Sequence, residues 1–442
     1  MTDLAGPNSI PPGPAQDYQP AQSLLDWMGG QFEQLGHIYR ASLYGAEVYV
    51  TRDPDHAHHV LVDNWQNYVK GLLIKRIALL LGNGLMVSEG ELWKRQRRMV
   101  QPALHGEAIT VFTRMIVAVN SALRERWRSA AERSESVNVT RDVSGMALEV
   151  VLRAIFGGDY EQAGYHFGLV SENPQRDMAF ASAFRNLRPV ILEAAARRRN
   201  LPPDSSDVLG MLLRARDAKS GQPMEERNLV NEIITLIVAG HETTASTLNW
   251  TWYLLSQHPE AEEKLAREVA ALPGVPDADD LPKTPYARQV IDEALRLYPA
   301  GWLLTRKALR DDRLGSYFVP AGTEIYIPPY FIQRRPDLWD DAGGFHPERF
   351  DSFQENRNRR AMVPFSAGPR NCVGEPLSRL EMRLHLLMIA RELRLRYPPS
   401  QAPELEAGVN LRSKHDFVMY PEIRTLAKPM AAQAAQAAKQ SA

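Results

Sequence analysis

The sequence is poor in cysteine: its 442 residues include only Cys372. One thiol cannot form an intrachain disulfide. It also cannot supply the four cysteines of an iron–sulfur cluster or a cysteine-rich zinc site. Such sparing cysteine use is typical of a reducing compartment and predicts a cytoplasmic protein.

An excess of charge and a long apolar run are also missing. The chain has 52 Lys and Arg against 53 Asp and Glu, so no global basic field exists to hold nucleic acid. No stretch approaches the roughly 20 apolar residues that span a bilayer. The first residues, Met1–Pro7, lack the basic start and apolar run of a signal peptide. We therefore expect neither a nucleic-acid partner nor a membrane anchor.

A dinucleotide fingerprint is absent as well. Gly82 and Gly84 begin such a pattern, but Val87 stands where the third glycine is needed. The chain is therefore not expected to bind its own nicotinamide or flavin dinucleotide.

What is present predicts a mainly α fold with a small β portion. Apolar residues recur at spacings of three and four, which predicts helices over 91–104, 108–131, 143–156, 226–257, 285–298 and 376–393. Strand patterns are few, the best being 46–51 and 323–327. We interpret 1–20 as a flexible Pro- and Gly-rich leader, 21–429 as a single domain and 430–442 as an Ala/Gln-rich tail.

The predicted helix over 226–257 contains residues that do not suit a buried helix. Its segment 233–239 is apolar nearly all round, which predicts a course through the interior. Gly240, Glu242 and Thr243 follow directly, and a glycine, an acid and a hydroxyl are costly there. Stability alone does not explain them.

The lone cysteine lies in an unusual setting. A free cysteine is most often a small buried hydrophobe. Here Gly368 and Gly374 permit close backbone approach, and Arg370 lies two residues before the sulfur. A helix is predicted to begin just after Gly374, and a helix N-terminus stabilises a thiolate. This arrangement suits a thiolate that binds a metal.

The segment resembles the haem-binding loop of the cytochrome P450 family, Phe-x-x-Gly-x-Arg-x-Cys-x-Gly. All five fixed positions are present, as Phe365, Gly368, Arg370, Cys372 and Gly374. Ser366 stands where the family often has glycine. The resemblance implies the P450 fold and a haem b cofactor. It also implies that the long central helix passes over the haem and that Cys372 ligates the iron from beneath.

A second segment, 239–244, resembles the oxygen-binding stretch of the family's central helix. The resemblance implies that Ala239 and Gly240 lie against the haem. It also implies that Thr243 hydrogen-bonds dioxygen and that Glu242 relays protons. The alternative is a threonine that bonds back to its own helix. His241 is expected to be packed or bridging, not an iron ligand.

Glu293 and Arg296 resemble the family's Glu-x-x-Arg pair, and Arg349 resembles the arginine that completes a buried structural network with them. An isolated pair of this kind would otherwise be interpreted as a surface ion pair.

Trp93 and Arg97 resemble the family's pair that donates to a haem propionate, and Arg306 and Arg370 are further propionate candidates. The neighbouring Lys94, Arg95 and Arg98 form either a solvated helix face or a docking surface for an acidic electron donor.

The resemblance implies a haem-thiolate monooxygenase. It would insert one oxygen atom from O2 into a C–H bond of a lipophilic small molecule, such as a fatty acid or terpenoid. Electrons would come from a separate ferredoxin or flavodoxin with an NAD(P)H-dependent reductase, and we expect a monomer. Arg76, Arg185 or Arg188 could anchor a carboxylate. The alternatives are a peroxygenase or isomerase on the same fold, or a non-catalytic haem-binding sensor.

Family analogy also suggests pocket-lining apolar residues: Leu72, Leu73, Ile74, Leu79, Leu80, Met86, Phe180, Phe184, Trp302 and Leu303, with the segments 236–243 and 417–418. Many of these could equally fill the core.

Overall fold

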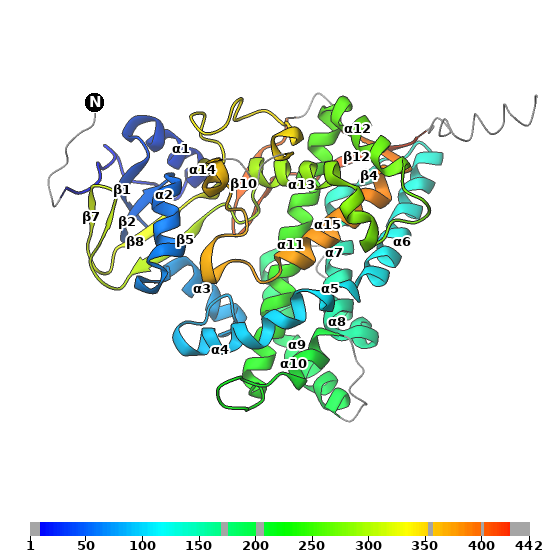
Figure 1. Ribbon diagram of the computed structural model, residues 1–442, viewed down its shortest axis with the longest axis horizontal. Coiled ribbons are helices and arrows are strands. Elements are labelled where there is room, and N and C mark those ends of the chain that lie inside the picture. The colour runs from blue at the N-terminus through cyan, green and yellow to red at the C-terminus, as the bar shows by residue number, and fades with distance from the viewer. Residues whose placement is uncertain (1–8, 169–175, 200–206, 352–356, 399–401, 425–442) are drawn as a thin grey trace, which may run out of the picture.

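The computed structural model describes residues 9–168, 176–199, 207–351, 357–398 and 402–424. For 76–80, 165–168, 176–185 and 357–358 it describes the backbone alone. Helices make up most of it. Most of the strands lie at one end of the molecule, whereas the strands at 137–138 and 418–423 lie among the helices on the other side (Figure 1). This confirms the predicted class. The helices of nine residues or more are α1 (Leu24–Leu35), α3 (Leu72–Leu81), α4 (Gly90–Val100), α6 (Thr113–Glu132), α7 (Val139–Phe156), α8 (Tyr160–Gly168), α9 (Arg176–Arg199), α11 (Glu226–Gln257), α12 (Pro259–Ala270), α13 (Pro285–Leu297) and α15 (Glu375–Ala390).

Helix α11 runs through the middle of the helical part, as Figure 1 shows. It has the predicted bounds and stops before His258 and Pro259, where a proline prevents its continuation. It packs against α7, α13 and α15. Side chains on all sides of α11 are buried over much of its length, which explains why its segment 233–239 is apolar nearly all round.

The largest sheet has five strands in the order β1-β2-β8-β5-β3. The two predicted strands, β2 and β8, lie side by side and parallel, and the other pairs are antiparallel. The register of β3 and β5 places Lys70 opposite Arg306. The strands are β1 (Ile38–Leu43), β2 (Ala46–Thr51), β3 (Tyr68–Lys70), β5 (Leu304–Ala308) and β8 (Glu324–Ile327).

Most of the remaining strands have two to four residues, which is too short for an alternating pattern, and the six-residue strand at 418–423 was not predicted either. They form a three-stranded sheet, β4-β12-β9, and two hairpins. Their bounds are β4 (Val137–Asn138), β9 (Leu393–Arg396), β12 (Val418–Ile423), β6 (Asp312–Leu314), β7 (Tyr317–Val319), β10 (Leu405–Ala407) and β11 (Leu411–Ser413). The short helices include α2 (Pro54–His58), α5 (Glu107–Thr110), α10 (Val208–Arg214) and α14 (Pro329–Ile332).

The expected helices differ from the structure in two main places. The helix predicted over 108–131 is two helices, α5 and α6, and the helix over 376–393 ends at Ala390 because Leu393 begins β9. The described part of the predicted leader is attached to the domain. The carbonyl groups of Ser9 and Pro12 accept hydrogen bonds from the N–H groups of Phe318 and Arg40. Among the described residues, no helix combines the length and apolar character needed to cross a bilayer.

Candidate active site

Cys372 lies in the loop that leads into α15. Its side chain is exposed on one side and closely surrounded by protein on the others. Burial raises the pKa of the thiol, while the N–H groups of Gly374 and Glu375 at the start of α15 act in the opposite direction. A metal bound to such a thiol deprotonates it outright, and these N–H groups then stabilise the thiolate. The predicted ligand therefore has the surroundings that thiolate ligation needs.

The backbone of this loop is tightly folded. The Cys372 N–H donates to the Phe365 carbonyl at 2.9 Å. Gly368 has φ +70°, and a Cβ on it would collide with the backbone of Leu61. Ser366 also has a positive φ, +64°, at the position where glycine is common in the resembling family. Serine in place of glycine at position 366 therefore strains the backbone of the loop.

The predicted oxygen motif lies in the middle of α11. Ala239 is exposed and Thr243 half-buried there, although the helix on either side is mostly buried. The Thr243 hydroxyl donates to the Ala239 carbonyl at 2.8 Å. The threonine therefore bonds back to its own helix, which is the alternative weighed from sequence. The lone pairs of its hydroxyl oxygen remain available to accept a further hydrogen bond. Gly240 permits close packing, because a Cβ there would lie 3.0 Å from Val151.

The carboxylate of Glu242 is a quarter exposed and lies 3.9 Å from the Nε2 atom of His241. His241 itself is buried, and its Nδ1 atom lies 2.9 Å from the Ile237 carbonyl oxygen. This agrees with the packed or bridging histidine expected from sequence. The relay roles of Thr243 and Glu242 stay predictions.

A cluster of buried cations lies beside the cysteine loop. Arg306 and Lys70 are each 7% exposed and face each other across β5 and β3. Arg370 forms an ion pair with Glu89. Burial, with the repulsion of Arg370, lowers the pKa of Arg306 to about 10. Burial likewise lowers the pKa of Lys70 to about 7. Positive charge is therefore in excess in this interior.

Sequence reasoning missed Lys70 and Glu89. Glu89 accepts the N–H of Lys70 at 2.6 Å, and the Lys70 ammonium donates to the carbonyls of Leu85 and Ser88 at 2.7 and 3.0 Å. The available signal was the pair of Lys70 and Gly71 at the end of a short strand, and such pairs are too common to indicate a binding site.

These residues fit an anionic cofactor. The Nε and Nη1 atoms of Arg370 are buried and have no hydrogen-bond partner. A guanidinium presents such donors in the planar form that carboxylates accept. Two haem propionates would satisfy these atoms and balance the excess charge, with Arg370 and Arg306 as their partners. This donor set, together with the thiol of Cys372, fits haem b.

The helix α4 supports this cluster. The guanidinium of Arg370 lies 4.8 Å from the ring centre of Trp93. Arg97 donates to the carbonyl and side-chain oxygens of Asn371 at 2.6 and 2.8 Å, and its Nε atom donates to Gln101. Arg97 therefore holds the residue just before Cys372. A contact from Trp93 or Arg97 to a propionate stays a prediction.

The predicted Glu293–Arg296–Arg349 network is present. Arg296 donates to Glu293 through Nε and Nη2 at 2.7 and 2.8 Å, and neither side chain is exposed. Arg349 donates to the same carboxylate at 3.0 Å. The surface ion-pair alternative is wrong. The network reaches the cysteine loop through Gln333, which accepts the N–H of Val363 at 2.9 Å.

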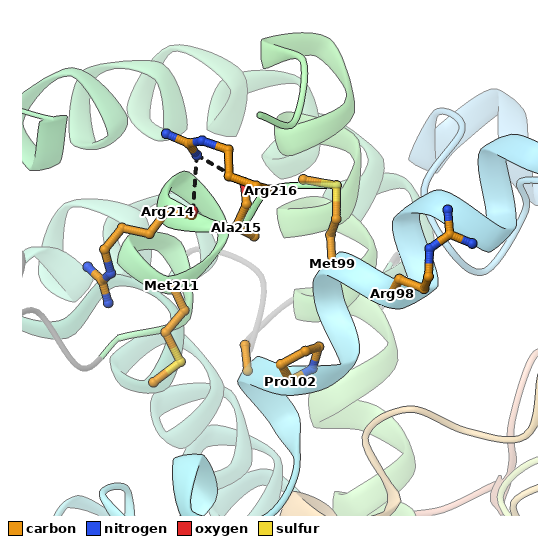
Figure 2. A pocket seen from close by; sticks show the side chains of 8 residues that line it. Arg98, Met99, Pro102, Met211, Arg214, Ala215 and Arg216 are labelled. Atoms are coloured by element: carbon orange, nitrogen blue, oxygen red, sulfur yellow. Dashed lines mark hydrogen bonds between the residues drawn. The ribbon is translucent and has the colours of Figure 1, made fainter. Parts of the chain in front are cut away.

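A separate surface pocket of about 470 Å³ lies between α4 and α10. In Figure 2 the guanidinium groups of Arg98, Arg214 and Arg216 point away from its centre, and Met99 and Met211 form its walls. None of the residues predicted to contact haem or oxygen lines it, although Arg98, a candidate for docking of an electron donor, does.

The three basic residues weighed from sequence as a solvated helix face or a docking surface for an electron donor have intramolecular partners. Lys94 donates to Glu91, Arg98 to Asp217, and Arg95 to the Pro223 carbonyl, at 2.7, 3.1 and 3.0 Å. The two arginines tie α4 to the segment before α11.

Comparison with known proteins agrees with this geometry. The family description Cytochrome P450 matches residues 13–168 and 180–418. Cyclooctat-9-en-7-ol 5-monooxygenase of Streptomyces melanosporofaciens is 31% identical over 82% of this chain and 83% of its own length. Carotene epsilon-monooxygenase of Arabidopsis thaliana is 28% identical over 90% of this chain and 80% of its own. The solved cytochrome P450DA heme domain superposes with a TM-score of 0.83 at 22% identity, covering 94% of this chain and 98% of that one.

The fold and the cysteine loop thus define a haem-thiolate protein, and the chain belongs to the cytochrome P450 family. It is a P450 monooxygenase whose cofactor is haem b. The cofactor, when bound, supplies the activation of O2, and a thiolate ligand favours cleavage of the O–O bond.

Proposed function

We propose that the enzyme hydroxylates a terpenoid-like lipophilic molecule. The observation that supports this most is the exposed centre of α11. Ala239 is exposed and Leu236 half-buried on the face that also carries Thr243. Met86 and Leu303, expected pocket residues, are also half-buried. The apolar side chains of Leu236 and Ala239 on the face of Thr243 suit a substrate without charge.

Other expected pocket residues have different surroundings. Trp302 is buried and donates to the Gly408 carbonyl at 2.9 Å, and Phe417 is buried among aromatic rings. Both belong to the core. The side chains of Leu79, Leu80, Phe180 and Phe184 lie outside the described residues.

The relatives favour a terpenoid over a fatty acid. Two carry names that state action on carotene and on cyclooctat-9-en-7-ol. A fatty acid would need a cation for its carboxylate. Of the three suggested arginines, Arg188 is exposed on α9, and the side chains of Arg76 and Arg185 lie outside the described residues.

In this proposal Thr243 and Glu242 relay protons from solvent to the oxygen-binding side of the haem. The Thr243 hydroxyl would accept and pass on a hydrogen bond while α11 holds it in place. Glu242, partly exposed, would exchange protons with solvent. Electrons would come from a separate ferredoxin or flavodoxin with an NAD(P)H-dependent reductase, and the enzyme would act as a cytoplasmic monomer.

The test is a binding titration of the purified holoenzyme with a carotenoid, a cyclic diterpene alcohol and a long-chain fatty acid, followed by the shift of the haem Soret band. Turnover with added ferredoxin and reductase under labelled O2 then identifies the product by mass spectrometry. We expect one labelled oxygen in a terpenoid. A shift and a product with the fatty acid alone would overturn the substrate class, and Arg188→Ala would show whether that arginine is the anchor.

A further inference from the structure

A single turn of π-helix lies directly beneath the cysteine loop. This turn, η1 (His59–Asp63), is closed by a hydrogen bond of 2.8 Å from the Asn64 N–H to the His59 carbonyl. Such turns are rare and frequently occur at functional sites. The middle of the turn contacts Gly368 so closely that a Cβ on this glycine would collide with the carbonyl group of Leu61. The position of η1 therefore determines the position of the loop.

One carboxylate holds both ends of this turn. The Oδ2 atom of Asp312, in strand β6, lies 3.0 Å from the Nε2 atom of His59, the first residue of η1. The same atom accepts a hydrogen bond of 2.9 Å from the side-chain amide of Asn64, the residue that follows the turn. Asp312 thus bridges the turn from its beginning to its end.

Two further groups fix the carboxylate itself. The Tyr68 hydroxyl donates to Oδ2 at 2.6 Å, and the N–H of Arg313 donates to Oδ1 at 2.8 Å. Burial alone would raise the pKa of Asp312, but the hydrogen bonds that it accepts hold this pKa below its ordinary value. The side chain is only 13% exposed, so water competes poorly for these bonds.

The loop also contacts the residues that follow the turn. The guanidinium of Arg370 lies 5.9 Å from the ring centre of Trp65, in the short helix η2 (Trp65–Asn67). The segment between η1 and β3 is therefore fixed against Asp312 on one side and lies against the cysteine loop on the other.

We propose that Asp312 is a positioning residue for the thiolate ligand, acting through the π-helical turn. It does not touch the cysteine. Its role is to hold η1 against Gly368, so that the cysteine loop keeps Cys372 in the position from which it would ligate the iron. The inference rests on membership of the P450 family and is independent of the proposed substrate.

The test replaces Asp312 by asparagine in the holoenzyme. The amide has nearly the same size but has one acceptor oxygen instead of two and no charge. Whichever way it is oriented, its N–H2 group faces a donor: the Asn64 amide and the Tyr68 hydroxyl on one side, or the Arg313 N–H on the other. The readout is the spectrum of the dithionite-reduced, carbon monoxide-bound protein, which separates thiolate-ligated haem from haem whose cysteine is protonated or displaced. We expect Asp312→Asn to convert to the second form at least tenfold faster than the native protein, with a shifted haem reduction potential.

Two variants serve as references. Asp311→Asn changes the neighbouring carboxylate, which is exposed and accepts the Ala321 N–H, and should convert at the native rate. Tyr68→Phe removes one of the donors to Oδ2 and should be intermediate. It also carries the test if Asp312→Asn fails to fold.

Gly368→Ala disturbs the same contact from the opposite side. If Asp312 acts through η1, the double variant Asp312→Asn/Gly368→Ala should convert no faster than the faster single variant. Hydrogen exchange should rise together in 59–64 and 366–374 in Asp312→Asn. A folded Asp312→Asn or Tyr68→Phe with native conversion rate, native potential and unchanged exchange in 366–374 would overturn the proposal. These readouts need neither substrate nor electron donor, so they do not depend on the substrate class.

Discussion

Replacement of Glu293 by glutamine tests the buried network most directly. The Glu293 carboxylate accepts hydrogen bonds from the Nε and Nη2 atoms of Arg296, the Nε atom of Arg349 and the N–H of His346, all at 2.7–3.0 Å. The substitution keeps the shape but removes the charge. Arg296 then remains as a fully buried cation with carbonyl partners alone.

The expected cost is large. Removal of one partner of a buried ion pair destabilises a protein by about 3–5 kcal/mol. That is a substantial share of a total stability of roughly 5–15 kcal/mol. Glu348→Gln is a matched control, because Glu348 pairs with Lys264 at 2.8 Å and both are about half exposed, at 55% and 52%. Such a surface pair contributes about 0–1 kcal/mol.

The assay is denaturant unfolding of the holoenzyme, followed by circular dichroism and by the haem Soret band. We expect the order of destabilisation to be Glu293→Gln, then Arg349→Ala, then Glu348→Gln. Because Gln333 links the network to Val363, the Soret change in Glu293→Gln should precede loss of helix. If Glu293→Gln lowers the free energy of unfolding no more than Glu348→Gln does, the buried network does not stabilise the core.

Three further predictions follow from single residues. Ser366→Gly should stabilise the holoenzyme by about 1 kcal/mol in thermal unfolding, because Ser366 has φ +64°. Ser366→Ala removes the same buried, unpartnered hydroxyl but keeps the Cβ, so it should stabilise less than Ser366→Gly. His385 accepts from Trp252 and lies 2.7 Å from the Asn120 side-chain oxygen, and burial lowers its pKa to about 3. The unfolded chain therefore binds a proton at His385 first, so this residue alone should lower stability by about 1.4 kcal/mol per pH unit as the pH drops below about 6.5. In unfolding titrations, His385→Gln should reduce the pH slope by that amount. Thr243→Ala should bind substrate normally but release hydrogen peroxide in place of product. Thr244→Ala is the control and should keep forming product, because the Thr244 hydroxyl bonds to Gly240 and Ser378. Equal product-to-peroxide ratios in native and Thr243→Ala enzyme would remove Thr243 from the relay.

The sequence by itself determined the local features of this protein. The bounds of α11 follow from its apolar run and the Pro259 stop, and β2 was located by its alternation. The cysteine loop, the central-helix motif and the Glu293–Arg296 pair were all identified because their residues are close in sequence. In each case the chemistry depends on neighbours within about one helical turn or one loop.

Only the tertiary structure decided how distant segments meet. Lys70 joins the cation cluster because β3 pairs with β5 across more than two hundred residues, and no local pattern encodes that register. Asp312 meets His59, Asn64 and Tyr68 for the same reason. The partners of Arg97 and Arg98 likewise lie far away in sequence. Burial and pairing of this kind arise from packing between elements, so a single sequence reveals the residues but not which of them share one site.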